Sequence, residues 1–260
     1  MPRDNKTPLV QKIARQACDT FKGFDPSAVS DGEFSKKQSE LVALMTAVRA
    51  ADLRLSPRKT AAGSGRDTAT PPVSYMHICE TDAFSMGVFL LRSGASIPLH
   101  DHPSMNGMLK VLYGKVSIRC FDKLEHGASD PPVFEPPLLP FQKDSLRRCL
   151  LRSVGEYCED SGPCLLTPLR DNLHRIDALD GPAAFLDILA PPYDSDDGRD
   201  CHYYKVLKRA AAGGPQGDTE AEQRDGQEDQ ETETWLLEIP QPDDFWCGGE
   251  SYPGPTVSVQ

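Results

Sequence analysis

Two histidines separated by one residue, His100 and His102, are the side chains with the clearest capacity for chemistry in this chain. Residues two apart on an extended strand project to the same face, so both imidazoles can reach one point. Pro98 and Pro103 flank the pair and stiffen the backbone on either side. This spacing predicts two-point binding of a metal ion. A third histidine, His174, lies in another strand-like run and completes a three-histidine metal site if the fold brings the two strands together.

A His-x-His pair on a surface strand is an ordinary coincidence, so the glycines around it matter. Gly94 and Gly114 stand at the spacings that the first cupin motif, Gly-x5-His-x-His-x3-4-Glu-x6-Gly, requires around this pair. Where that motif has its glutamate, this chain has Asn106 and Gly107. The likeness to the motif therefore covers the histidines and glycines and lacks the acidic ligand.

The second cupin motif, Gly-x5-Pro-x-Gly-x2-His-x3-Asn, is matched more loosely by Gly162, Pro168 and His174. One extra residue precedes the histidine, and the second glycine of the motif is absent. His174 is accordingly a less specific prediction than His100 and His102. A ligand set without the glutamate resembles that of the thiol dioxygenases. These are the cupins that use three neutral histidines in place of three histidines and a glutamate.

Four longer segments extend this resemblance. They are similar to the cysteamine-oxidising thiol dioxygenases of animals and to the related plant cysteine oxidases, both of the cupin superfamily. The segments are IPLHDHPSMNGMLKVLYG, DNLHRIDA, GPAAFLDILAPPYD and GRDCHYYKVL. The similarity spans about 73–207 and resumes in TWLLEIPQPDDFWCGGESYPGP, and it is weakest in 22–70 and in an acidic stretch before that last segment.

The resemblance implies a mainly β fold, the cupin double-stranded β-helix or jelly-roll barrel, with N-terminal helices packed outside. It implies ferrous iron, Fe(2+), held by His100, His102 and His174, with O2 as the co-substrate. Both oxygen atoms would be placed on a thiol sulfur, so that cysteamine becomes hypotaurine and the N-terminal cysteine of a peptide or protein becomes cysteine sulfinic acid. Through the second substrate, such an enzyme would act as an oxygen sensor in N-degron proteolysis and the hypoxia response.

The ligand set suits this chemistry. Three neutral imidazoles leave the metal ion its full positive charge and open positions for an anionic thiolate and for O2. Coordination also lowers the pKa of a thiol and favours thiolate at neutral pH. Three histidines and a water are, however, a catalytic zinc arrangement as well. A zinc-dependent cupin hydrolase and a non-catalytic cupin that binds a small molecule stay open as alternatives, and the family likeness is what favours iron.

Asp187 and Tyr193 are candidates for a role beside the metal. Strand alternation places Asp187 on the same face as Phe185 and opposite Leu186. A carboxylate there either forms a buried structural ion pair or lines the pocket, where it would orient a ligand histidine or hold the substrate's ammonium group. Tyr193 follows the rigid Ala-Pro-Pro run, and its hydroxyl would reach the pocket mouth, with half-buried packing as the alternative.

Cys201 and Tyr203 lie two apart, so on a strand they share a face and can approach each other. Related cysteine dioxygenases join a cysteine and a tyrosine near the iron by a thioether, at other positions of the chain. The resemblance thus raises a Cys201–Tyr203 crosslink as a hypothesis, against simple packing with a free thiol. The remaining histidines, His77, His126 and His202, have no spacing partner and are expected to be ordinary residues, with His77 the next choice as a third ligand.

Helices are expected in the first part of the chain. Apolar residues at 9, 10, 13, 14, 17 and 21 share one helical face, and those at 34, 41, 44, 45 and 48 share another. We expect residues 1–55 to form a helical extension packed against a barrel wall. The segment 56–72 is rich in Gly, Pro, Ser and Thr without periodicity, which indicates a linker or loop. A barrel domain would follow over 73–260.

The rest of the chain contains short runs typical of strands, at 73–80, 84–92, 107–114, 115–122, 164–168, 173–179, 183–189, 202–207 and 234–240. A turn at Gly114–Lys115 would join two of them as a hairpin. Many short strands on this spacing fit a closed barrel or a double-sheet jelly roll better than a parallel α/β sheet. The 23 prolines and the apolar fraction of 38% agree with short segments separated by turns.

The formal net charge of −11 reflects an acidic stretch, which we expect to be a disordered insertion at about 209–233. A basic face for phosphates is not indicated, so nucleic acid is not an expected partner. No apolar run is long enough for a membrane helix, and the N-terminus lacks the apolar core of a signal peptide. Eight scattered cysteines without a Cys-x-x-Cys pair argue for free thiols in a reducing compartment. We expect a soluble cytoplasmic monomer, with the nucleus as a further location.

Overall fold

The structure is a computed structural model that describes residues 7–23, 32–57, 70–124, 131–210 and 232–259. Most of the expected linker at 56–72, most of the expected acidic insertion at 209–233, and His126 lie outside these described residues. Within the described ranges, no helix is both long enough and apolar enough to cross a membrane.

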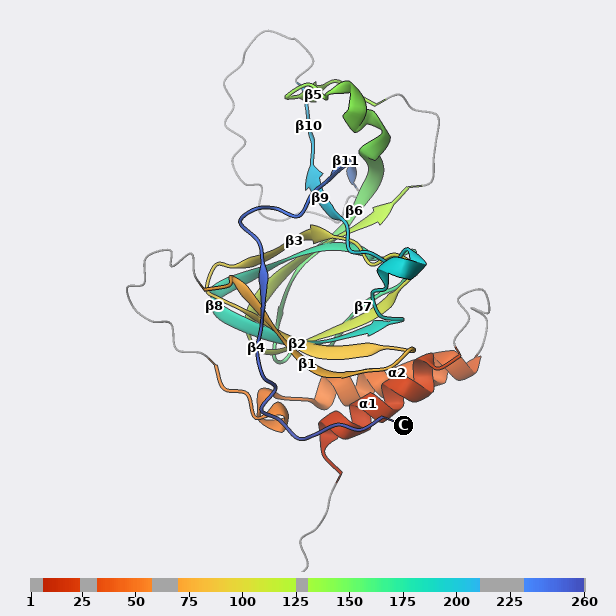
Figure 1. Ribbon diagram of the computed structural model, residues 1–260, viewed down its shortest axis with the longest axis vertical. Helices are drawn as coiled ribbons and strands as arrows, with labels where there is room; N and C mark the ends of the chain where they lie inside the picture. The colour runs from red at the N-terminus through yellow and green to blue at the C-terminus, as the bar shows by residue number, and fades with distance from the viewer. Residues whose placement is uncertain (1–6, 24–31, 58–69, 125–130, 211–231, 260) are drawn as a thin grey trace, which may run out of the picture.

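Two α-helices and a short 3-10 helix lie against the outside of a barrel, beneath β1 and β2 in the view of Figure 1. They are α1 (Leu9–Phe21), α2 (Gly32–Ala47) and η2 (Ala50–Leu53). The apolar face expected of the first helix is buried in α1, and Leu41 and Met45 are buried in α2. These side chains form one core cluster with residues from the outer face of the barrel. Burial of this apolar surface is what attaches the helices to the barrel wall.

The barrel is built from antiparallel strands, as the short apolar runs predict (Figure 1). The strands are β1 (Val73–Glu80), β2 (Ser85–Leu91), β3 (Ser96–His100), β4 (Asn106–Lys123), β5 (Phe134–Glu135), β6 (Leu146–Cys158), β7 (Cys164–Leu166), β8 (Leu173–Ala190), β9 (Tyr203–Val206), β10 (Lys208–Arg209), β11 (Thr232–Ile239) and β12 (Cys247–Gly249). Two short 3-10 helices, η3 (Pro140–Ser145) and η4 (Ser195–Asp197), lie in the connections. The mainly β barrel with N-terminal helices outside is confirmed.

β4 and β8 close the barrel by pairing with each other along their length. The strands neighbour one another in the order β12-β1-β2-β8-β3-β9-β11-β6-β4-β7, and the additional β8–β4 pairing joins the two arms of this sheet. β8 pairs with β2 through its second half and with β3 through its first half. Because β3 carries His100, this pairing decides which part of β8 lies beside the candidate metal ligands.

The hairpin predicted at Gly114–Lys115 is wrong, because β4 continues without a turn through this point. Gly114 has a φ of 74°, and the pairing register with β8 shifts between Val111 and Tyr113 and again between Tyr113 and Lys115. A glycine with positive φ can serve as a bulge that bends a strand without ending it. A Cβ at Gly114 would lie 2.4 Å from the carbonyl oxygen of Pro182, so the close approach of β8 also requires glycine here.

The runs predicted at 173–179 and 183–189 are likewise one strand, β8, which bends at Asp180 and Gly181. Both residues have positive φ, and side chains change faces at this bend. Before it, Ile176 and Ala178 point into the barrel core, and after it Phe185 does. The inward positions therefore change from even to odd numbers. This change puts His174 and Asp187 on the same interior face, although simple alternation would separate them.

β6 was not predicted, because its run of residues 146–158 contains three arginines and lacks a clear alternation. It pairs with β4 on one side and with β11 on the other. Two of these arginines bridge to acids of β11: Arg147 contacts Glu238 at 3.1 Å, and Arg148 contacts Glu233 at 2.7 Å. Because such a strand is stabilised by ion pairs with its neighbour, its sequence lacks the apolar alternation by which strands are recognised.

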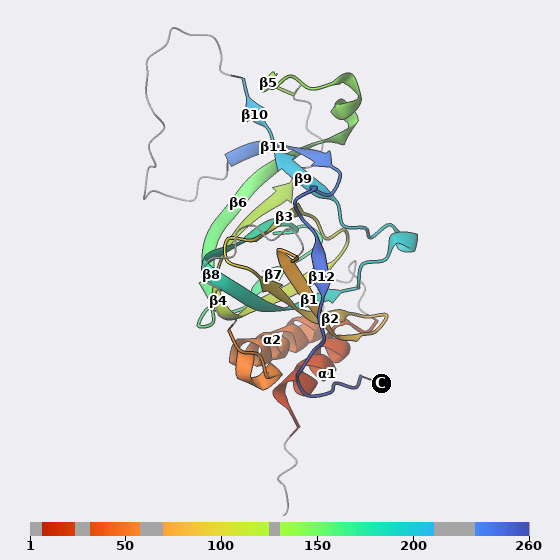
Figure 2. The same cartoon turned by 60° about the vertical axis from the view of Figure 1, so that its left-hand side comes forward.

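The C-terminal segment crosses the outside of the barrel beside β1 and ends near α1 (Figure 2). β12 pairs parallel with β1. Further on, the side-chain amide of Gln11 donates to the carbonyl oxygen of Ser258 at 2.8 Å and accepts from the Ser258 N–H at 2.9 Å. These two hydrogen bonds join α1 to the C-terminal segment on the outside of the barrel.

Candidate metal centre

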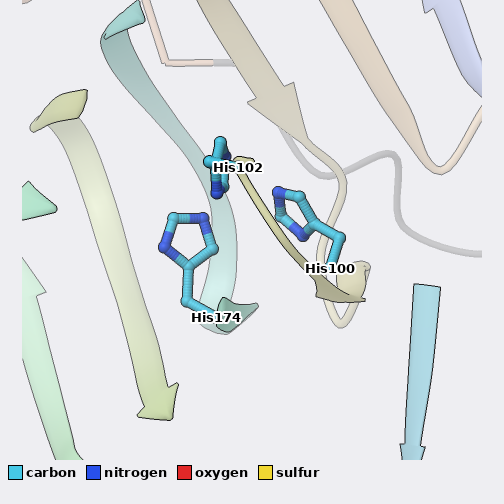
Figure 3. Close-up of side chains that lie close together, drawn as sticks. All are labelled: His100, His102 and His174. Atoms are coloured by element: carbon cyan, nitrogen blue, oxygen red, sulfur yellow. The ribbon is translucent and has the colours of Figure 1, made fainter. Parts of the chain in front are cut away.

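His100, His102 and His174 come together inside the barrel, with candidate ligand nitrogens that all lie within 4.8 Å of one another. Figure 3 shows the three rings turned toward a common point, from the end of β3, from the loop after it and from β8. All three side chains are buried. His100 and His174 are register partners on adjacent antiparallel strands, which explains their proximity.

Hydrogen bonds to backbone carbonyls fix the orientation of two of the rings. The Nδ1 of His100 lies 2.8 Å from the carbonyl oxygen of Pro98, and the Nδ1 of His102 lies 3.0 Å from that of Asn172. A carbonyl only accepts, so each Nδ1 carries the proton in these contacts. The Nε2 of each ring is therefore left with its lone pair, as metal coordination requires.

The electrostatic setting keeps these imidazoles neutral. Burial lowers the pKa of His102 to about 3, with the nearby His100 adding to the effect. Burial also lowers the pKa of His100. The pKa of His174 is lowered mainly by burial, and the nearby His102 and His100 add to the effect. Neutral imidazole is the ligating form of histidine. The donor set therefore fits a divalent transition metal such as iron or zinc.

The cupin glutamate position brings no fourth ligand. Gly107 is two residues from Leu109 on β4, so both face the barrel interior. Asn106 is two residues from Met108, and both face outward. A Cβ on Gly107 would lie 2.7 Å from Cγ of Leu166, so a leucine side chain occupies the adjacent space. The site consequently offers three neutral ligands and leaves the rest of the coordination sphere open.

Asp187 lies on the interior face of β8, opposite Gly87 of β2 and Leu109 of β4. Burial raises the pKa of its carboxyl group to about 7. Within the described residues it has no cationic partner, which does not support the buried ion pair that the sequence left open. Tyr75 of β1 projects over Gly87, and its hydroxyl lies in the same region as this carboxyl group. Asp187 is thus a carboxyl group without a counter-charge in the barrel interior.

Tyr193 lies beside the histidines. Its ring centroid is 5.7 Å from that of His102, and its hydroxyl donates a 2.8 Å hydrogen bond to the carbonyl oxygen of Asp101. With 36% of its surface exposed, the side chain borders solvent as well as the metal-binding candidates. It therefore lies at the edge of the three-histidine group, with its hydroxyl bound to the backbone of Asp101.

Cys201 and Tyr203 are also brought to this site. Burial raises the pKa of the Cys201 thiol to about 11, although the neighbouring hydroxyl groups of Tyr193 and Tyr203 act to lower it. Tyr203 is the register partner of His100, and their ring centroids are 6.4 Å apart. The cysteine is a free thiol here. The structure thus brings together all seven residues that the sequence singled out, either at the three-histidine group or on the interior surface around it.

Other charged residues near the motifs lie elsewhere. Arg175 is on the outer face of β8 and binds Asp177 and Ser96, as its place next to His174 predicts. Arg170 is exposed and lies 3.7 Å from Asp171. His77 lies on β1, exposed and outside the three-histidine group.

Two buried polar residues were missed by the sequence analysis. Asp101 lies between the two paired histidines, and Asn172 lies two residues before His174. The available signal was position: a polar residue inside a buried His-x-His pair must point away from the ligands, and a buried polar group needs partners. The sequence does not reveal which partners the fold supplies.

Comparison with known proteins gives a consistent result. The PCO_ADO family profile matches residues 44–257. The chain is 55% identical to the human protein 2-aminoethanethiol dioxygenase and 57% identical to the mouse protein of the same name. Both alignments cover 99% of this chain and 99% of the relative. It is also 33% identical to plant cysteine oxidase 1 of Arabidopsis thaliana, over 52% of this chain and 42% of that protein.

Proposed function

The chain belongs to the PCO_ADO family, and we propose that it is an iron-dependent thiol dioxygenase that uses O2 to convert cysteamine to hypotaurine. The observation that carries this proposal is the group of three neutral, buried histidines without an acidic ligand. Full-length similarity to proteins named 2-aminoethanethiol dioxygenase supports the same reaction. We extend the proposal to peptides that begin with cysteine, with the plant cysteine oxidase relative as support.

His100, His102 and His174 would hold the iron through Nε2, Nε2 and one ring nitrogen, respectively. When bound, ferrous iron supplies the electrons for O2 activation and the positive charge that favours a thiolate over a thiol. The protein contributes the orientation of the rings, through the carbonyl groups of Pro98 and Asn172. It also provides the interior wall against which the substrate lies.

Asp187 is the group we assign to the substrate's amine. A carboxyl group without a counter-charge on the interior wall would bind an ammonium group well, since the pair removes the cost of burying either charge alone. Arrival of the ammonium would shift the carboxyl group to its ionised form. Cysteamine and an N-terminal cysteine share an amine two carbons from the thiol, so the same contact serves both substrates.

Among the described residues, neither arginine close to His174 in the chain faces the barrel interior, where it could bind a substrate carboxylate. Arg175 binds Asp177 on the outer face of the barrel, and Arg170 is exposed beside Asp171. An arginine fork is the usual partner of a carboxylate because it donates two parallel hydrogen bonds. This arrangement supports an aminothiol or a cysteine whose carboxyl group is in a peptide bond, rather than free cysteine. Oxidation of such protein N-termini in the cytoplasm would make the enzyme an oxygen sensor for N-degron proteolysis.

The experiment is a metal analysis combined with an O2-uptake assay on cysteamine. Purified wild-type protein should contain or take up ferrous iron, consume O2 and form hypotaurine, detected by mass spectrometry. Zinc as the active metal with hydrolysis and no O2 uptake would instead support a hydrolase. Binding of a small molecule with neither activity would support a non-catalytic cupin.

A further inference from the structure

Asp101 is a buried carboxylate on which several neighbouring segments converge. It lies between His100 and His102, and 1% of its surface is exposed. One carboxylate oxygen, Oδ2, accepts from the ammonium group of Lys123 and from the hydroxyl group of Tyr204, each at 2.8 Å. The other, Oδ1, accepts from the backbone N–H of His202 at 3.0 Å and lies 3.1 Å from the ring Nδ1 of the same residue.

The backbone of Asp101 makes two more contacts in the same region. Its N–H donates to the carbonyl oxygen of His202 at 3.1 Å, and its carbonyl oxygen accepts from the Tyr193 hydroxyl at 2.8 Å. His202 and Tyr204 flank Tyr203, and Cys201 directly precedes His202. Asp101 therefore connects the metal-binding loop to Tyr193 and to the segment that carries Cys201 and Tyr203.

The chemistry of these contacts calls for a carboxylate. Four donor groups meet two oxygens, and each oxygen receives two of them. An asparagine offers one acceptor oxygen and an NH2 group, so in either orientation its NH2 would face two donors. Two oxygens that only accept therefore match these four donor groups, whereas a neutral amide does not.

We propose that Asp101 is a positioning residue of the dioxygenase site, which fixes Cys201, Tyr203 and Tyr193 relative to the iron ligands. This inference rests on the proposed function. Strand pairing between β3 and β9 is confined to a single register pair, His100 with Tyr203. Such a short pairing needs further contacts to hold the two segments in one arrangement, and the four donors to Asp101 supply them. Because Tyr203 lies beside His100, any shift of this segment changes the wall next to bound substrate.

The test compares Asp101→Asn with two further variants in the full-length protein. Tyr204→Phe removes a single donor and keeps the buried ring, so it carries the test if Asp101→Asn does not fold. Asp177→Asn is the matched control, since Asp177 also accepts from a basic group and a hydroxyl group, those of Arg175 and Ser96, but on the outer face of the barrel.

The first readout needs neither iron nor substrate. Hydrogen–deuterium exchange of the metal-free protein should show faster exchange in peptides that cover 199–206 in Asp101→Asn and, to a smaller extent, in Tyr204→Phe. The exchange of this segment should stay at the wild-type rate in Asp177→Asn. Equal protection of 199–206 in all four proteins would overturn the inference, whether or not the proposed reaction is correct.

The second readout is the ratio of O2 consumed to sulfinate formed, measured on iron-loaded protein with cysteamine. We expect one O2 per sulfinate in the wild type and in Asp177→Asn. In Asp101→Asn we expect an excess of O2 consumed, together with a loss of about 10- to 100-fold in kcat/KM. A variant that only lost stability or iron would lower both amounts and keep the ratio. An unchanged ratio in Asp101→Asn and Tyr204→Phe contradicts the inference, whereas a wild type without O2 uptake contradicts the proposed function.

Discussion

Asn172 holds His102 by three hydrogen bonds that run in both directions. Its side-chain oxygen accepts from the His102 N–H at 3.1 Å, its side-chain NH2 donates to the His102 carbonyl oxygen at 2.7 Å, and its backbone carbonyl oxygen contacts the His102 Nδ1 at 3.0 Å. The NH2 group also donates to the carbonyl oxygen of Thr167 at 2.9 Å. One residue therefore fixes both the backbone and the ring of a candidate iron ligand, and it lies two residues from another, His174.

Replacement of Asn172 by alanine should lower the affinity for iron about 10- to 100-fold, because the His102 ring would lose its fixed backbone. The buried N–H of His102 would be left without its partner, at a cost of about 1–3 kcal/mol in the free energy of unfolding, while its carbonyl oxygen would keep the hydrogen bond from the Met105 N–H. Titration with ferrous iron and thermal unfolding measure the two effects. Asn106→Ala is the control, since the Asn106 side-chain nitrogen has no partner in the described part of the chain. Equal iron affinity of the two variants would contradict the role of Asn172.

Replacement of His174 by alanine should remove most of the bound iron and the dioxygenase activity, because a three-ligand site loses much of its affinity with each ligand. Elemental analysis of the purified variant measures the iron content. His77→Ala serves as the control, since His77 lies outside the three-histidine group. Full iron occupancy in His174→Ala would mean that the third ligand is another residue.

That His100 and His102 act together could be predicted from their spacing, but the expected strand holds only His100, and His102 lies in the loop after β3, where Asn172 positions it. The strands could be predicted in the same way where apolar residues alternate. The bends at Gly114 and Gly181 could not, since a glycine between two apolar runs reads equally as a turn or as a bulge. That choice depends on the partner strand, which the sequence does not specify.

The hydrogen bonds that hold the metal-binding residues in place could not be predicted from the sequence either. The contacts of Asp101 to Tyr204 and of Asn172 to His102 join residues that are far apart in the chain. The role of each polar residue is set by tertiary pairing, and nothing in its immediate neighbours distinguishes it from a solvated residue. Asp187 could be predicted in part. Strand alternation predicts that it shares a face with Phe185, but only the fold shows that its carboxyl group has no ion-pair partner among the described residues.

Asp187→Asn should make the protein more stable at pH 8 and raise the KM for cysteamine. The folded-state pKa of about 7 lies above the ordinary value of 3.8, so the stability that the protonated carboxyl group contributes is complete below about pH 4 and is lost as pH rises to about 7. The full shift corresponds to about 4 kcal/mol, and partial contact with solvent reduces our expectation to about 1–2 kcal/mol. The stability difference between variant and wild type should therefore vanish near pH 4.

Urea unfolding at several pH values measures this difference. Asp177→Asn is a control of opposite sign: burial alone would raise the Asp177 pKa, but hydrogen bonds from Arg175 and Ser96 lower it overall. Its removal should destabilise the protein above about pH 4. A gain in stability of Asp187→Asn that is the same at pH 4 and pH 8 would show that ionisation of Asp187 is not its cause.

A thioether between Cys201 and Tyr203 should form during aerobic turnover, because the thiol lies close to the phenol, whose ring is next to the candidate ligand His100. A bond would form between the sulfur and the ring carbon next to the hydroxyl group, an S–H and a C–H bond would break, and O2 would accept the two electrons and two protons. The intact mass should then fall by about 2 Da. Cys201→Ser, treated in the same way, should show no such change beyond its substitution. Unchanged mass in the turned-over wild type would leave Cys201 as a packing residue.

The enzyme should oxidise cysteamine and a peptide that begins with cysteine, and it should prefer both to free cysteine. All three substrates offer an amine two carbons from the thiol, which Asp187 can bind, but only free cysteine brings a carboxylate. Arg170 and Arg175 are the arginines nearest to His174 in the chain, and both lie outside the barrel interior, where the first is exposed and the second is bound to Asp177. A carboxylate in the pocket would thus lack the planar, doubly donating partner that stabilises it and would lie near the acidic Asp187. Mass spectrometry of the sulfinate product, with kcat/KM for each substrate, measures which of the three substrates is preferred. Cysteine methyl ester is the matched control, because it removes only the negative charge of the carboxylate. We expect the ester to be oxidised better than free cysteine. If free cysteine were preferred to both cysteamine and the peptide, the pocket would have to contain a carboxylate partner, and Arg170 would be the first residue to replace.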